Sequence, residues 1–374
     1  MGMLPVLCSA AQEASLQEKV SLKASSCSGP RVAVNAEQQV FFVWEGLLEG
    51  RSRIFFRGKN GPDWEPETIL DGTEWGDNTE PSITLDDHGN PYVVWTFHDQ
   101  ECSSVYYTFR LRNSWVQPVL LRQSGENNCE FADIAVQPGT NRIFVTWQEG
   151  RGSRYAIYAA TQDKGGKFVT EQVSAPEHAG FNSFPQMAIA PTPFLTWYGS
   201  GESDFLLHAA LFDLQTEHWM RYEPSGLERL PANRLPFLMP DEQGTLFAVW
   251  YDSDGATDRI YFRRQGDASS DKGLIVDGNP ERMNNLPMGV VSLQGRVFIC
   301  WRGESLFGGQ IFLTSGEAVS GSEFQESQLI SDGQKLFYTE PDCAPDPQGG
   351  VAVVWASSAL DGGDGSVYYR HVKP

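Results

Sequence analysis

The stretch that decides the fold runs from Pro81 to Trp95 and reads Pro-Ser-Ile-Thr-Leu-Asp-Asp-His-Gly-Asn-Pro-Tyr-Val-Val-Trp. Two short apolar runs flank a polar turn, Asp87-His88-Gly89-Asn90. Turn residues between runs rich in β-branched and aromatic residues are typical of a β-hairpin. The stretch therefore predicts two antiparallel strands, the second of which ends at the tryptophan.

The same unit recurs along almost the whole chain. Seven tryptophans each end an apolar run, at successive separations of 51, 52, 50, 53, 51 and 54 residues: Trp44, Trp95, Trp147, Trp197, Trp250, Trp301 and Trp355. A proline stands 14 residues before the tryptophan in five repeats and 12 before it in a sixth, while Ala132 takes the corresponding place in the third repeat. Short strands in units of about 40 to 50 residues are typical of a β-propeller. We expect these tryptophans to pack between blades rather than to bind a ligand.

Each repeat holds enough sequence for four strands, but the last repeat reaches Pro374 after only three. Conversely, the segment 16–22 precedes the first repeat and resembles a lone fourth strand. The sequence therefore predicts an all-β fold, a seven-bladed β-propeller of four-stranded antiparallel blades over residues 15–374. An N-terminal strand completes the last blade and closes the ring, which removes exposed sheet edges. Residues 1–14 are expected to be a leader remnant or a disordered N-terminus.

Charge excludes several kinds of partner. The chain has 48 acidic and 28 basic side chains and a formal net charge of -20. Such a field repels phosphate, so neither nucleic acid nor an anionic membrane surface is expected to bind. No run approaches the roughly 18 to 20 apolar residues that a membrane span needs. A glycan or a protein ligand remains, and we expect a monomer.

The cysteines and the N-terminus bear on the compartment. None of the six cysteines forms a CxxC pair or a Cys/His cluster with zinc spacing. Cys102 and Cys129 fall in adjacent loops of one face, where a disulfide is geometrically feasible, and Cys27 with Cys343 is a weaker second pair. Cys300, beside a blade tryptophan, is expected to be buried and inert. Small residues at 9–11 resemble the cleavage site of a secretory leader, which favours a secreted or periplasmic protein.

The run Pro81–Trp95, followed by Val105-Tyr-Tyr, resembles repeats of the sialidase-like, BNR-repeat propellers. The turn Thr161-Gln-Asp-Lys-Gly-Gly-Lys-Phe168 resembles a degenerate Asp box, with phenylalanine in place of the usual tryptophan. The resemblance covers nearly the whole chain as architecture. It also implies six blades, several Asp boxes, an arginine triad and an early Phe-Arg-Ile-Pro motif. This chain has seven repeats and one such box, and it lacks the motif and a recognisable triad.

We assign the site to the face that carries the loops between the second and third strands and the loops between blades, because these vary most. The expected ligand-binding residues there are Trp75, Phe97 and His178. Trp75 is the one tryptophan of eleven without a place in the repeat, so it could stack on a sugar ring or anchor a partner. Alternatively, it folds over the edge of a neighbouring blade.

The leading hypothesis is a non-catalytic recognition propeller for a glycan or an extracytoplasmic protein; a structural or assembly role is a minor alternative. The enzyme alternative is a uronic-acid lyase or a glycoside hydrolase on the same face. A lyase would use His98 or His178 as base, Tyr198 or Tyr251 as proton donor, and Arg302 to neutralise a substrate carboxylate. Paired carboxylates could instead hydrolyse a glycoside, depending on their separation.

An acidic loop offers the one candidate metal site. Asp252, Asp254 and Asp258 supply oxygen ligands at short spacing that could hold Ca²⁺, although the loop departs from the EF-hand pattern. The alternative is a solvated acidic loop. No other cofactor is expected.

Overall fold

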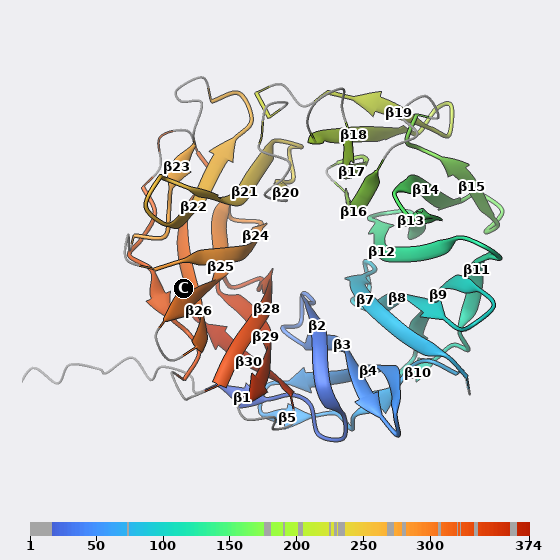
Figure 1. Cartoon of the computed structure of the whole chain (residues 1–374), viewed down its shortest axis with the longest axis horizontal. Helices are drawn as coiled ribbons and strands as arrows, with labels where there is room; N and C mark the ends of the chain where they lie inside the picture. The colour runs from blue at the N-terminus through green and yellow to red at the C-terminus, as the bar shows by residue number, and fades with distance from the viewer. Residues whose placement is uncertain are drawn as a thin grey trace, which may run out of the picture.

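The computed structural model describes residues 17–72, 75–175, 181–189, 191–200, 205–223, 226–227, 230, 236–267, 273–278, 282–305, 308–319, 321, 323–332, 336–359 and 365–374. Seven antiparallel sheets form a ring, which confirms the predicted seven-bladed, all-β propeller (Figure 1). The secondary structure of the described residues contains no helix, and so none that could span a membrane. The predicted leader remnant, 1–14, lies outside these ranges.

In each blade the first strand lies nearest the centre of the ring and the last strand lies at the rim (Figure 1). Blade one comprises β2 (Ser25–Val34), β3 (Val40–Leu48), β4 (Arg51–Asn60), β5 (Asp63–Trp64) and β6 (Thr68–Ile69). Blade two comprises β7 (Asp77–Leu85), β8 (Pro91–His98), β9 (Ser103–Leu111), β10 (Ser114–Trp115) and β11 (Val119–Ser124). Blade three comprises β12 (Asn128–Gln137), β13 (Arg142–Arg151), β14 (Arg154–Gln162) and β15 (Phe168–Gln172).

The remaining blades follow the same order. Blade four comprises β16 (Asn182–Ile189), β17 (Pro193–Ser200), β18 (Phe205–Asp213) and β19 (His218–Tyr222). Blade five comprises β20 (Phe237–Pro240), β21 (Leu246–Ser253), β22 (Asp258–Arg264) and β23 (Leu274–Ile275). Blade six comprises β24 (Asn284–Val291), β25 (Arg296–Ser305), β26 (Gly308–Glu317) and β27 (Gln328–Leu329). Blade seven comprises β28 (Leu336–Pro345), β29 (Val351–Ala359), β30 (Ser366–Val372) and β1 (Glu18–Lys19).

Blades one and two differ from the expected four strands because their outer strand is split. β5 and β6 both pair with β4, and β10 and β11 both pair with β9. Pro66 and Pro118 lie in the two interruptions. Proline cannot donate to a ladder of backbone hydrogen bonds, so it ends one segment before the next begins.

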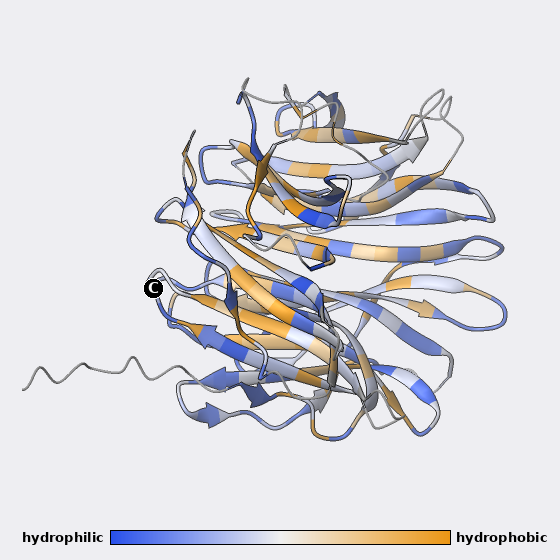
Figure 2. Ribbon diagram, turned by 60° about the vertical axis from the view of Figure 1, so that its left-hand side comes forward, coloured by the Kyte–Doolittle hydropathy of each residue, from blue (hydrophilic) through white to orange (hydrophobic). Residues whose placement is uncertain are grey.

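The repeat tryptophans form the core, as predicted. Each indole lies opposite a residue of the third strand, and six of these pairs stack at ring distances of 5.5 to 6.1 Å: Trp44–Phe55, Trp95–Tyr106, Trp147–Tyr158, Trp197–His208, Trp250–Tyr261 and Trp301–Phe312. All seven tryptophans are buried. Hydrophobic and hydrophilic residues form alternating bands along many strands (Figure 2). The middle strands β3 and β8 are nonetheless buried along nearly their whole length, because both faces of the sheet pack against neighbouring blades.

An asparagine near the start of the first strand holds the indole in three blades. The Oδ1 atoms of Asn78, Asn182 and Asn284 accept hydrogen bonds from the indole N–H groups of their own blades at 2.8, 3.2 and 3.0 Å. Each asparagine lies three residues before the repeat proline. In blades one and three a cysteine, Cys27 or Cys129, takes this position.

These cysteines are therefore core residues. Cys102 and Cys129 are both free thiols, as are Cys27 and Cys343, so neither suggested pair is bonded. Cys129 is fully buried, and its Sγ lies 4.0 Å from a carboxylate oxygen of Glu149, whereas Cys102 is half-buried. Cys300 is fully buried, as expected.

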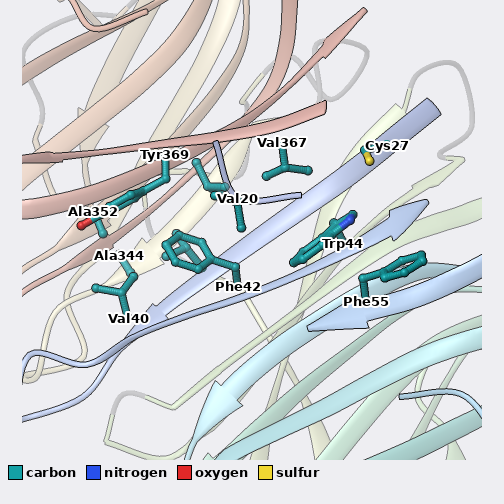
Figure 3. Close-up of a cluster of buried hydrophobic side chains, with 12 residues drawn as sticks. Val20, Cys27, Val40, Phe42, Trp44, Phe55, Ala344, Ala352, Val367 and Tyr369 are labelled. Carbon is teal, nitrogen blue, oxygen red and sulfur yellow. The ribbon is translucent and has the colours of Figure 1, made fainter. Parts of the chain in front are cut away.

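The N-terminal strand closes the ring as predicted. β1 pairs with β30, and Val20 then donates its N–H to the carbonyl of Val367 at 2.8 Å. Ser21 Oγ accepts the N–H of Val367 at 3.0 Å. In four other blades a serine or aspartate after the outer strand caps the same N–H of the third strand: Asp71, Ser174, Asp277 and Ser331. Figure 3 shows Val20 among side chains of blades one and seven.

Candidate functional site

The innermost strands carry a β-bulge at the residue before the repeat proline. The register of the ladder shifts there in β2, β7, β12, β16, β24 and β28. The bulged residues have φ between 50° and 55°: Gly29, Glu80, Phe131, Phe184, Leu286 and Glu340. The bulges lie at the loop face, defined as the end of the ring where first strands begin and second strands end. Because Phe131 precedes Ala132, the bulge does not require proline.

Glutamates gather at these bulges on the side of blades seven, one, two and three. We call Glu45, Glu80, Glu130 and Glu340 the carboxylate cluster. Glu80 Oε2 accepts the backbone N–H of Phe131 at 2.6 Å, and Glu45 Oε2 lies 3.4 Å from the backbone N of Glu80. Glu340 Oε2 likewise accepts the N–H of Gly29 at 2.7 Å. Each bond joins one blade to the next and satisfies an N–H that the bulge removes from the ladder.

Burial and the repulsion between neighbouring carboxylates disfavour the charged forms of Glu80 and Glu45. Burial, together with the negative charges of Glu130 and Glu45, raises the pKa of the Glu80 carboxyl to about 7. Hydrogen bonds from the Phe131 N–H and the Thr96 hydroxyl oppose this shift. Burial also raises the pKa of Glu45, and the charge of Glu340 adds to the effect. Glu80 therefore binds a proton near neutral pH, as some catalytic and ligand-binding carboxylates do.

Aromatic and amide groups border the cluster. The rings of Phe131 and Phe184, both half-buried, lie 4.5 Å apart. Glu130 accepts a hydrogen bond from Gln148 Nε2 at 2.8 Å and another from the Tyr155 hydroxyl at 3.4 Å. This part of the loop face thus combines carboxylate acceptors with aromatic rings, a set that can bind hydroxyl groups and the apolar faces of a ligand.

His98 borders the same cluster. It ends β8, is half-buried, and its Nδ1 lies 3.1 Å from the hydroxyl of Ser103. Burial lowers the pKa of the imidazole, against the opposing charges of Glu130 and Asp77. The ring is therefore mainly neutral at pH 7, the state that a general base or a hydrogen-bond acceptor requires.

The other residues of the lyase alternative lie in blades four to six and have structural partners. The Tyr198 hydroxyl is buried and donates to the carbonyl of Pro236 in the next blade. Burial raises the pKa of Tyr198 well above its ordinary value. Arg302 binds Glu304 at 2.8 Å, and its guanidinium lies 4.1 Å from the ring centre of Phe337. Tyr251 is half-buried and packs against the hydrophobic cluster of blades five and six.

The three predicted ligand-binding residues have different environments. Trp75 is 72% exposed and lies between blades one and two, next to Gly76, whose φ is +72°. Phe97 is only 6% exposed and meets the Tyr106 ring edge-on, so it is a core residue in this structure. His178 lies outside the described residues.

The acidic loop of blade five has its own internal bonds. Asp254 Oδ1 accepts the backbone N–H groups of Ala256 and Thr257, and Oδ2 lies 3.3 Å from Arg259. Asp258 begins β22, where it pairs with Ser253. The described residues contain no group of three or more His, Cys, Asp or Glu side chains arranged to hold a metal ion.

Comparison with known proteins supports the fold. No family model matches the chain, and no curated protein matches it significantly. A polysaccharide lyase of known structure aligns with 97% of this chain and 93% of its own, at 8% identity and a TM-score of 0.59. A leech intramolecular trans-sialidase, in complex with 2,7-anhydro-Neu5Ac, aligns with 94% of this chain and 68% of its own, at 10% identity and a TM-score of 0.52.

A puromycin-hydrolyzing peptidase of Mycobacterium tuberculosis also matches. The alignment covers 95% of this chain and 54% of the peptidase, at 13% identity and a TM-score of 0.55. Identities this low establish the fold and not the activity. The similarity is therefore one of fold: this chain shares its overall architecture with the trans-sialidase and the polysaccharide lyase, in line with the resemblance noted in the repeats.

Proposed function

We propose that this protein recognises a carbohydrate without cleaving it, and that the ligand is a neutral glycan bound at the carboxylate cluster. The observation that carries the proposal is the meeting of half-buried carboxylates with the Phe131–Phe184 pair at the loop face. Carboxylate oxygens accept hydrogen bonds from sugar hydroxyls, and aromatic faces pack against the apolar faces of sugar rings. The exposed Trp75 offers a further aromatic contact.

The negative charge of the carboxylate cluster favours neutral glycans over acidic ones. A uronic or sialic acid would bring a carboxylate toward Glu45, Glu80 and Glu130, and like charges at close range raise the free energy of binding. The net charge of -20 opposes an anionic polymer at longer range as well. A hydroxyl-rich neutral chain has neither disadvantage. The likeness to a polysaccharide lyase and a trans-sialidase supports a carbohydrate ligand, and the cluster supports a neutral one.

Calorimetric titration with neutral, sulfated and uronic-acid oligosaccharides tests the proposal. We expect a neutral oligosaccharide to bind, and Glu130→Gln and Trp75→Ala each to weaken that binding at least fivefold. Glu49→Gln, an exposed carboxylate outside the cluster, is the matched control and should leave the affinity unchanged. Preferential binding of uronic acids, or equal binding by all three variants, would contradict the proposal.

Hydrolysis of a neutral glycan is the second candidate, and one observation favours it. A carboxyl with a pKa of about 7 next to another carboxylate has the character of a general acid. Incubation of the purified protein with the same panel, followed by size-exclusion chromatography of the products, separates the two functions. Cleavage that Glu80→Gln abolishes would establish the hydrolase. Binding without cleavage would support recognition.

A further inference from the structure

A groove of about 570 Å³ lies between blades five and six, away from the carboxylate cluster. Its first wall is formed by β22 and β23, through Phe262, Leu274 and Ile275. Its second wall is formed by the segment after β26, through Val319 and Phe324. A cavity of this size is within the usual range for ligand sites.

Both walls are held in place. The Phe262 and Phe324 rings meet at 4.9 Å and 64°, which joins the two blades at the groove. The segment that carries Phe324 is fixed to β26, because the N–H of Gln325 donates to the Ser315 carbonyl and the Thr314 hydroxyl donates to the Gln325 carbonyl. A site formed before the ligand arrives loses less conformational entropy on binding.

The walls of the groove carry apolar side chains that are exposed to solvent. Leu274, Ile275 and Val319 are all exposed, although they line a concave surface. Exposed apolar side chains gathered in a groove are typical of a binding surface.

The charged residues around the groove indicate the sign of its ligand. Asp267, Glu323 and Glu326 line it together with one basic residue, Arg263. Three carboxylates against one guanidinium, on a chain of net charge -20, attract a cation. A complementary ligand would combine apolar side chains for the walls with positive charges for the rim.

We propose that this groove binds an extended basic peptide segment of another protein, in which an apolar side chain lies between lysine or arginine residues. Alternating side chains of an extended chain point to opposite sides, so one segment can place apolar groups inward and cations at the rim. The site is separate from the carboxylate cluster and does not depend on glycan binding.

Fluorescence anisotropy with three labelled peptides tests the proposal: Lys-Leu-Lys-Phe-Lys, Lys-Ser-Lys-Ser-Lys and Glu-Leu-Glu-Phe-Glu. We expect the first to bind at least tenfold more tightly than the other two. Equal affinity of the two basic peptides would overturn the proposal, because it would reflect attraction to an acidic surface alone. Absence of binding by the first peptide at millimolar concentration would also overturn it.

Matched variants locate the site. Leu274→Asp should weaken binding of the first peptide at least tenfold. Leu329→Asp is the control, since Leu329 is equally exposed on the outer strand of blade six and does not line the groove. Glu326 is exposed at the rim of the groove, and Glu326→Lys should also weaken binding of the first peptide. This variant replaces Leu274→Asp in the test if Leu274→Asp fails to fold. Loss of affinity in the control equal to that in Leu274→Asp would refute the location.

Discussion

Replacing Val20 with alanine tests the closure of the ring. The Val20 side chain has no exposed area and packs with Phe42, Trp44 and Tyr369 in one cluster (Figure 3). The substitution removes two methyl groups, which costs about 1.5 kcal/mol in transfer free energy. The cavity left between blades one and seven adds to this, so the free energy of unfolding should fall by about 2 to 3 kcal/mol.

Leu22→Ala is the matched control for this measurement. Leu22 lies two residues further along the same segment and is 59% exposed, so its loss should change stability by less than about 0.5 kcal/mol. The backbone bonds of Val20 to blade seven persist in the alanine variant, so the difference between the variants reports side-chain packing alone.

Urea unfolding followed by tryptophan fluorescence measures both variants, because the buried indoles report the packing between blades. Size-exclusion chromatography of the same variants detects self-association of the protein, which an unpaired edge of β30 would promote. If Val20→Ala and Leu22→Ala unfold at the same urea concentration as the unchanged protein, the N-terminal segment does not close the ring by burial, and the reasoning fails.

Three further outcomes are expected. Asn284→Ala should lower the free energy of unfolding by about 2 kcal/mol in the same urea assay, because it leaves the Trp301 indole N–H buried without its acceptor; a change below 0.5 kcal/mol would contradict this. Stability should fall by roughly 2 to 3 kcal/mol between about pH 4.3 and pH 7 through Glu80 alone, since its folded pKa is raised and the folded state therefore binds the proton more tightly. Glu80→Gln should flatten that part of the profile, and an unchanged slope would refute the assignment. Maleimide should modify Cys102 well before Cys129, because burial raises the pKa of the Cys129 thiol to about 12. Peptide mass spectrometry measures the order, and modification of Cys129 first would contradict the prediction.

The repeat could be predicted because its determinants are local. An apolar run that ends in tryptophan, a turn and a proline at fixed spacing recur within each unit, so seven blades and the closing strand follow from periodicity. The asparagine three residues before the proline belongs to the same local pattern. Aligned across the repeats, this position holds Cys27 and Cys129 in blades one and three, which indicates that both are core residues and argues against a bond between Cys129 and Cys102.

The site could not be predicted in the same way, because its contacts join different blades. Glu80 meets the Phe131 N–H across 51 residues of sequence, and the Tyr198 hydroxyl meets Pro236 across 38. Both residues stand at repeat positions whose side chains differ from blade to blade. Only the folded ring shows that the Tyr198 hydroxyl bonds one blade to the next, whereas the carboxylates lie around one shared surface.

The bulges explain why the loop face can vary while the ring stays constant. Gly29 shows that glycine fits the bulge, and a non-glycine residue at φ near +50° costs about 1 kcal/mol. The glutamates at two of the other bulges offset this cost by bonding the neighbouring blade, and Phe131 offsets it by contact with Phe184. Leu286 is exposed at the same backbone conformation, so burial compensates its strain only in part.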